Sequence, residues 1–340
     1  MDTMRTSRPP RQPWLTAPLV LSLLALAALV PAAAWAHPPD AGRLETLALF
    51  NAAALEAPEN LAIDRDGTIF ISLALTGEIR KISPDGAQST HAVLPVGPPL
   101  TPCGSFIGIM GGLVLDDDGD LFVSLAACDP ANRGVWKVAP DGAAARIAAL
   151  PPAALPNGIA MRRGQLFVAD SSLGLIWTLP ASGGTATVWA DDPLLKIPPG
   201  APFPGPNGLQ VFRGELYVSN SNQGTILAFP FGPHGEAGPV RVHATLPDDL
   251  GCDDFAFDEL GNLYCGTDPF NSLLKIAPDG SFTTVLTAAD GLDGPTSAAF
   301  GRRGQDRFDL YITNGAFPFF TTTFRPSLRR LHLGVPGVPR

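Results

Sequence analysis

The chain has 340 residues, with 23 Lys and Arg against 32 Asp and Glu, and a formal net charge of −9. This acidic balance argues against a nucleic-acid partner, because phosphate groups require a basic surface. The length is enough for one large domain with an ample core.

The first 36 residues predict a signal peptide. Arg5, Arg8 and Arg11 precede an apolar run from Trp14 to Val30, and the small-x-small cleavage pattern Ala34-Trp35-Ala36 follows. Cleavage there would leave 20 basic and 31 acidic residues, a net charge of −11. The alternative is a single membrane anchor, because the apolar run is close to the length of a membrane span. We expect cleavage, export to the periplasm or the cell exterior, and no stable membrane span in the mature chain.

After residue 58 a unit of forty-odd residues recurs six times. The first runs of the units begin at Glu59, Gly111, Asn157, Asn207, Asp253 and Thr296. Each unit continues, after a turn rich in Gly and Asp, with a second alternating apolar run such as Leu121–Ser124 or Leu216–Asn220, then a third and a weaker fourth. Four antiparallel strands per repeat are typical of a propeller blade. We therefore predict an all-β fold, a single six-bladed β-propeller over residues 37–340.

The ring needs a closing strand, because the last unit stops after its third run, Leu328–Leu333. The segment Leu44–Phe50, ahead of the first unit, is the candidate for the missing outer strand. The alternative is an open sandwich with accidental spacing, which six recurrences disfavour.

All four cysteines lie after residue 36, and an even count in an exported protein permits disulfides. Cys103 and Cys128 fall in loops on the same face of the second blade, so a bond between them is predicted. Cys252 and Cys265 share the fifth blade, but a simple hairpin register places them about three residues out of alignment, which disulfide geometry tolerates poorly.

Equivalent positions of a closed ring face one another, so the first residues of the units converge. Glu59, Asn157, Asn207 and Asp253 offer carboxylate and amide oxygens, which suit Ca²⁺, or Mg²⁺ or another divalent ion. Four such ligands leave coordination positions open for water and substrate. The alternatives are ordinary turns at the two Asn-Gly pairs and solvated loop acids at Asp253 and Asp254.

On these residues the chain resembles the senescence marker protein (regucalcin)/gluconolactonase-like family of calcium-dependent six-bladed propellers, in one superfamily with diisopropylfluorophosphatase and paraoxonase. The resemblance implies that Glu59, Asn157, Asn207 and Asp253 hold the metal. The sugar-lactonase members carry an Arg and an Asp where this chain has Leu155 and Gly158. Paraoxonases use histidines near the metal, whereas the five histidines here fall outside the ring-facing positions.

These features predict an exported Ca²⁺-dependent hydrolase of a lactone or related ester. Asp253, or Asp254 beside it, is the expected general base or nucleophile. Three apolar segments, 193–205, 106–110 and 317–324, are expected near the pocket, so the small-molecule substrate is expected to be more apolar than a sugar lactone. The alternatives are a binding module with a structural metal and a strictosidine-synthase-like propeller enzyme. The sequence leaves the oligomeric state open.

Overall fold

The protein is described from a computed structural model that covers residues 42–104, 106–198, 201, 204–247, 250–321 and 324–338. The predicted signal peptide, residues 1–36, lies outside the described residues. Across the described ranges, no helix is long and apolar enough to cross a membrane.

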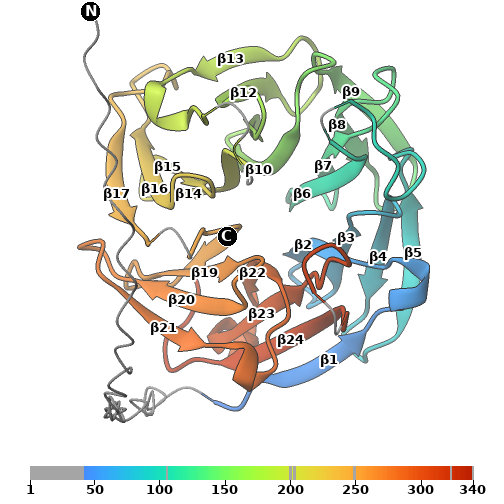
Figure 1. The fold of residues 1–340 in the computed structure, drawn as a ribbon, viewed down its shortest axis with the longest axis vertical. Coiled ribbons are helices and arrows are strands. Elements are labelled where there is room, and N and C mark those ends of the chain that lie inside the picture. Colours follow the sequence, from blue (N-terminus) through green and yellow to red (C-terminus); the bar gives the residue numbers. More distant parts are fainter. Residues whose placement is uncertain are drawn as a thin grey trace, which may run out of the picture. The chain divides into compact units, whose positions relative to one another are not determined.

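Six four-stranded antiparallel sheets stand around a ring, as the propeller prediction requires (Figure 1). The first three sheets consist of β2 (Pro58–Ile63), β3 (Ile69–Leu73), β4 (Glu78–Ile82) and β5 (Gln88–Val93); β6 (Ile109–Leu115), β7 (Leu121–Ala126), β8 (Gly134–Val138) and β9 (Ala144–Ala149); and β10 (Pro156–Arg162), β11 (Gln165–Asp170), β12 (Leu175–Pro180) and β13 (Thr187–Ala190).

The other three sheets consist of β14 (Pro206–Phe212), β15 (Glu215–Asn220), β16 (Thr225–Pro230) and β17 (Arg241–Thr245); β18 (Phe255–Phe257), β19 (Leu263–Thr267), β20 (Ser272–Ile276) and β21 (Phe282–Leu286); and β22 (Pro295–Phe300), β23 (Asp309–Asn314), β24 (Ser327–His332) and β1 (Glu45–Leu49). Four short 3-10 helices lie in the connections: η1 (Ala52–Ala54), η2 (Pro193–Leu195), η3 (Ala288–Asp290) and η4 (Gly304–Phe308).

The ring is closed by the N-terminal strand, as predicted. Strand β1 pairs antiparallel with β24 and is the outermost strand of the sixth blade. Ala48 and Phe50 are buried there, in a cluster that also contains Leu328. The last blade is therefore built from both ends of the described chain.

The apolar faces of neighbouring blades pack against each other. Between the first and second blades, Phe70 and Ile79 share a cluster with Leu121 and Val123. Between the third and fourth, Phe167 and Phe229 do the same. The alternating apolar residues of the sequence thus face the next blade, which is how the repeat buries its core.

The inner strands are bulged at the same repeat position in five of the six blades. The register between inner and second strand shifts around Glu59, Gly111, Asn157, Asn207 and Thr296. A bulge re-aims the side chain that it contains. In the fifth blade the equivalent residue, Asp253, precedes the short strand β18 altogether.

The predicted Cys103–Cys128 disulfide is confirmed, with a Cα–Cα distance of 5.2 Å. The expectation for the other pair was wrong, because Cys252 and Cys265 also form a disulfide, with a Cα–Cα distance of 5.8 Å. A simple hairpin register does not extend to Cys252, since β18 begins only at Phe255 and the two residues before it, Asp253 and Asp254, both bond to Gly266.

Deleting residues 42–50 from a chain that starts at His37 should lower the melting temperature. The deletion exposes the edge of β24 and removes buried Phe50, whose burial alone contributes about 1.5–3 kcal/mol. Thermal unfolding followed by circular dichroism measures the effect, with Leu49→Ser, at an exposed position of β1, as the control. An unchanged melting temperature in the deleted chain would contradict the closure.

Candidate functional site

The four residues predicted to converge line one cavity of about 190 Å³. Around it stand Glu59, Ile109, Leu155, Pro156, Asn157, Pro204, Asn207, Ser221, Gly251, Asp253, Asp268, Phe270, Phe317, Phe319 and Phe320. Glu59, Asn207 and Asp253 are buried, and Asn157 is half-buried. Four different blades therefore contribute at least one polar side chain each to a single small space.

The two Asn-Gly pairs are parts of strands β10 and β14, not turns. A Cβ atom on Gly158 would collide with the carbonyl of Asn207, and one on Gly208 with Asp254. Glycine is required after each asparagine because the inner strands approach each other closely at the bulge. The turn interpretation of these pairs is wrong.

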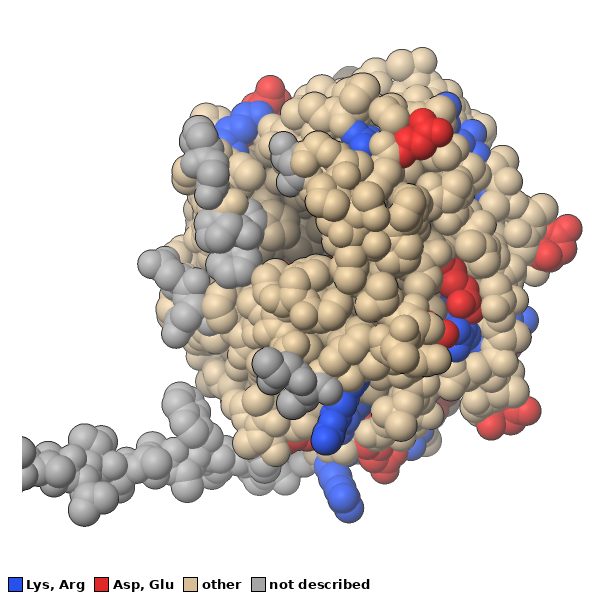
Figure 2. All heavy atoms as spheres, turned by 45° about the vertical axis from the view of Figure 1, so that its right-hand side comes forward, with Lys and Arg blue, Asp and Glu red and all other residues tan. Residues whose placement is uncertain are grey.

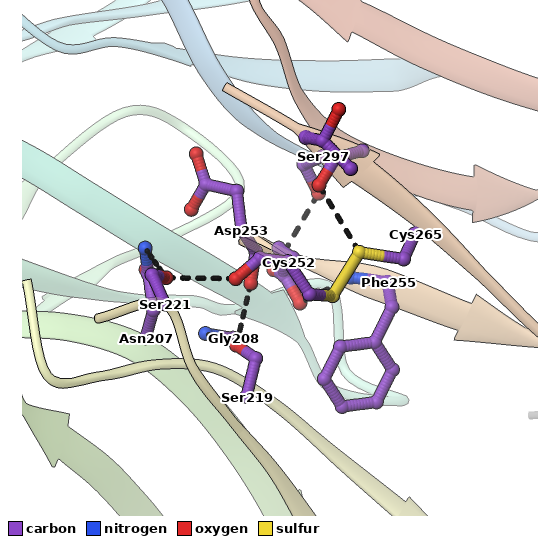
Figure 3. The surroundings of a disulfide bond; sticks show 12 residues. Asn207, Gly208, Ser219, Ser221, Cys252, Asp253, Phe255, Cys265 and Ser297 are labelled. Carbon is purple, nitrogen blue, oxygen red and sulfur yellow. Dashed lines mark hydrogen bonds between the residues drawn. A yellow bond between two sulfur atoms is a disulfide. The ribbon is translucent and has the colours of Figure 1, made fainter. Parts of the chain in front are cut away.

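The side chain of Asn207 is oriented by its neighbours (Figure 3). Its Nδ2 donates to Ser221 Oγ at 3.1 Å, and Ser221 Oγ donates to the carbonyl of Cys252 at 2.7 Å. With its NH₂ group engaged in this way, Asn207 keeps its Oδ1 as an acceptor for the cavity.

Asp268 is a site residue that the sequence reasoning missed. It follows β19 directly, lines the cavity, and its Oδ1 is buried with no hydrogen-bond partner. It occupies the repeat position that Ser221 occupies in the fourth blade. The ends of the second runs mark its position in the sequence, although the residue types at that position differ between blades.

Among the residues that the structure describes, three carboxyl groups thus share the cavity, and no Lys, Arg or His lines it. Burial, followed by the charge of Asp268, raises the pKa of Glu59 to about 8. Burial and the charge of Glu59 raise the pKa of Asp253 well above its usual range. Burial and the nearby Asp293 raise the pKa of Asp268 to about 7. A group of acids that resists ionisation in this way favours a cation among them.

The residues fit a divalent cation only as a mixed set. Among the described residues, no three His, Cys, Asp or Glu side chains gather closely enough to hold a metal by themselves. The amide oxygens of Asn157 and Asn207 must therefore complete the set. Buried Glu59 Oε2, which has no hydrogen-bond partner, is an acceptor available for this purpose. Such an all-oxygen set suits Ca²⁺ or Mg²⁺.

Asp254 points elsewhere. It lines a second cavity, of about 550 Å³, together with Asn60 and Gln210. Its carboxylate accepts hydrogen bonds from Asn60 Nδ2, from the Phe255 amide at 2.7 Å and from Ser297 Oγ at 3.4 Å. The structure therefore does not bring it to the cavity that contains the four predicted ligands.

Much of the remaining lining of the cavity is apolar. Each of the three apolar segments of the sequence contributes to it, through Ile109, Pro204 and the phenylalanines at 317, 319 and 320. The rings of Phe317 and Phe319 stack at 5.1 Å, and those of Phe319 and Phe320 meet edge to face at 4.7 Å. Phe319 and Phe320 are half exposed. Figure 2 shows one hollowed face whose visible surround is largely uncharged, with most charged side chains toward the periphery.

The family model of the SMP-30/gluconolactonase/LRE-like region matches residues 200–316. The predicted family resemblance is confirmed over this stretch. It contains Asn207, Asp253 and Asp268, three of the polar residues of the cavity. No match was found among curated protein sequences.

Solved structures show the same fold at low sequence identity. A gluconolactonase from Xanthomonas campestris is 20% identical, with 89% of this chain and 93% of that chain covered and a TM-score of 0.64. A luciferin-regenerating enzyme is 16% identical, with 87% and 97% covered and a TM-score of 0.64. A calcium-binding protein, regucalcin, from Agrobacterium tumefaciens is 16% identical, with 87% and 94% covered and a TM-score of 0.60.

Calcium should raise the melting temperature of the purified protein, because a cation offsets the repulsion among the buried carboxylates. At a Ca²⁺ concentration a hundred times the Kd, the free energy of unfolding should increase by about 2.7 kcal/mol. Glu59→Gln should lose most of this gain, whereas the exposed-site control Glu259→Gln should keep it. Differential scanning calorimetry with and without chelator measures the shift, and an equal gain in Glu59→Gln would count against the site.

Proposed function

We propose that the protein is an exported, Ca²⁺-dependent hydrolase of a lactone or related ester whose substrate is more apolar than a sugar lactone. The observation that carries this proposal is the mixed lining of the cavity. Three carboxyl groups and two asparagines line it, with no basic side chain among the described residues, and aromatic and aliphatic side chains line it too.

Glu59, Asn157, Asn207 and Asp253 would hold the cation. When bound, a divalent cation supplies Lewis acidity that polarises an ester carbonyl and stabilises the developing oxyanion. The remaining tasks belong to the chain itself. The two asparagines orient the substrate, and the surrounding apolar side chains limit the access of bulk water.

Asp253 remains our first choice for the base that activates water, or for the nucleophile, because its carboxylate lines the cavity. Asp268 is a further candidate for the base on the same ground. Asp254 is the weaker choice, since its oxygens are engaged by Asn60 and Phe255 at the second cavity.

The apolar part of the lining supports an alkyl or aryl substituent on the substrate. Leu155 lines the cavity two residues before Asn157, where the sugar-lactonase pattern has an Arg. A hydrophobic side chain there offers no hydrogen bond to a sugar acid, whereas it packs well against a hydrocarbon group.

Export is supported by the two disulfides, because disulfides form and persist in oxidising compartments. A mature N-terminus at His37, detected by mass spectrometry of the protein recovered from its natural host, would test this part of the proposal independently of the activity.

Hydrolysis of a panel of lactones and esters, with and without Ca²⁺, is the central test. On the best substrate, Asp253→Asn should reduce the rate by on the order of 10² to 10⁴, because it removes a charge from the metal site and the preferred base. Asp254→Asn should cost less. If both variants keep wild-type turnover, the chemistry lies elsewhere. If the wild type binds Ca²⁺ but hydrolyses nothing, the protein is a binding module.

Phe320→Ala should raise KM for substrates with alkyl or aryl groups by about tenfold, because it removes apolar surface that the substrate would cover. KM for the smallest unsubstituted lactone should change little. Leu260→Ala is the matched control, since Leu260 is also exposed but lies outside the cavity lining. A uniform change across all substrates would argue against a contact with the substituent.

A further inference from the structure

We propose that the Cys252–Cys265 disulfide is a positioning device for the site, holding Asp253 where a cation needs it. The cation part of this inference rests on the proposed function. The part that concerns the backbone of Asp253 does not.

Asp253 differs from the other three predicted ligands in its support. Glu59 lies in β2, Asn157 in β10 and Asn207 in β14, so each belongs to a strand of six or seven residues. Asp253 lies two residues before β18, which has only three residues. Asp253 is therefore linked to β19 by the hydrogen bond of its amide to the Gly266 carbonyl rather than as part of a long strand.

The disulfide adds a covalent link to the segment that carries Asp253. Cys252 is the residue directly before Asp253, and Cys265 lies in the middle of β19, paired with Phe255 on one side and Leu274 on the other. Both cysteines are buried. The bond therefore ties the segment that carries Asp253 to a strand fixed from both sides (Figure 3).

Hydrogen bonds to the same segment depend on its position. The Asp253 amide donates to the Gly266 carbonyl at 2.8 Å, and the Asp254 amide donates to the Thr296 carbonyl at 3.0 Å. Ser219 Oγ donates to the Asp253 carbonyl at 2.6 Å. If the disulfide is removed, only hydrogen bonds of this kind restrain the segment, and local opening becomes easier.

The disulfide also reaches a second predicted ligand. The Cys252 carbonyl accepts from Ser221 Oγ, and Ser221 Oγ accepts from Asn207 Nδ2. A shift of Cys252 would therefore disturb the orientation of Asn207 as well as the place of Asp253. Groups that orient metal ligands in this way affect affinity as strongly as many ligands do.

The charges of the carboxylates in the cavity explain why such a restraint is needed. Glu59, Asp253 and Asp268 line the same cavity, so their carboxylates repel one another when ionised. Of these three residues only Glu59 lies within a strand of the inner ring. Asp253 therefore depends on the bonds of the segment before β18 to keep its place against this repulsion.

The experiment compares the double variant Cys252→Ala/Cys265→Ala with Cys103→Ala/Cys128→Ala, which loses the other disulfide. The first bond spans 13 residues and the second spans 25, so chain entropy alone predicts that losing the second costs at least as much stability. The volume-conserving pair Cys252→Ala/Cys265→Val serves if the first variant folds poorly.

Two quantities are measured on each folded protein. Calorimetric titration with CaCl₂ should give a Kd about 10- to 100-fold weaker for the Cys252/Cys265 variant and an unchanged Kd for the other. Native-state hydrogen exchange should be at least about tenfold faster at the Asp253 and Asp254 amides in the first variant alone.

The two readouts separate the inference from the proposed function. If the wild type binds no Ca²⁺ while exchange at Asp253 accelerates as expected, the metal proposal fails and the positioning role stands. Unchanged exchange at Asp253 and Asp254 in the Cys252/Cys265 variant would overturn the positioning role, whatever the calcium titration gives. Equal effects of the two variants on both readouts would also overturn it, because they would indicate a general loss of stability.

Discussion

The geometry of the ring depends on one repeated hydrogen bond. A side-chain hydroxyl in the second strand of a blade donates to a backbone carbonyl at the start of the next blade. Ser72 donates to the carbonyl of Gly111 at 2.9 Å, and Ser124 donates to that of Asn157. Ser219 donates to Asp253 at 2.6 Å and Thr313 to Glu59 at 3.3 Å. Each acceptor carbonyl belongs to the first residue of a repeat unit. The bonds that join the blades thus also fix the backbone of three predicted ligands.

In two blades the second strand has no such hydroxyl, and the backbone packs directly against the neighbouring blade. The third blade has Ala169 at the position and the fifth has Gly266. Gly158 of the third blade lies against the Asn207 carbonyl, and Gly266 lies against the Pro295 carbonyl, so a side chain at either glycine would collide with the neighbouring blade. The centre of the ring is therefore too crowded for regular strands, and the bulges accommodate this crowding. The side chains at the bulged positions have room only in the direction of the cavity.

The sequence could predict the fold because each repeat carries its own pattern of strands and turns. The closing strand followed from counting, since one outer strand was missing. The symmetry of the ring was enough to predict that four residues would line one cavity, without any knowledge of side-chain packing. These residues are Glu59, Asn157, Asn207 and Asp253. The Cys252–Cys265 bond could not be predicted, because a simple hairpin register takes no account of the irregular backbone before Phe255. The cavity that the Asp254 side chain faces could not be predicted either, since neighbouring residues of an irregular segment can face different cavities.

Asp268 illustrates a different limit of the sequence reasoning. Its position in the repeat is readable, yet the residues that share this position include Ser221 and Ala74, so no common chemistry draws attention to it. Only the burial of its Oδ1 beside Glu59 and Asp253 reveals that it belongs to the same electrostatic unit. Functional roles that arise in one repeat alone are the hardest to infer from repetition.

The closure of the ring affects when the protein can finish folding during its synthesis. Glu45 of β1 and Arg330 of β24, which form an ion pair, are 285 residues apart in the chain. A ribosome delivers β1 first and its partner last, so the sixth blade cannot be completed until nearly the whole chain has been synthesised. Throughout that interval β1 has no partner strand, and unpaired strand edges of this kind make incompletely folded chains prone to aggregation. The cavity that contains Glu59 and Asp253 can therefore mature only at the end of biogenesis.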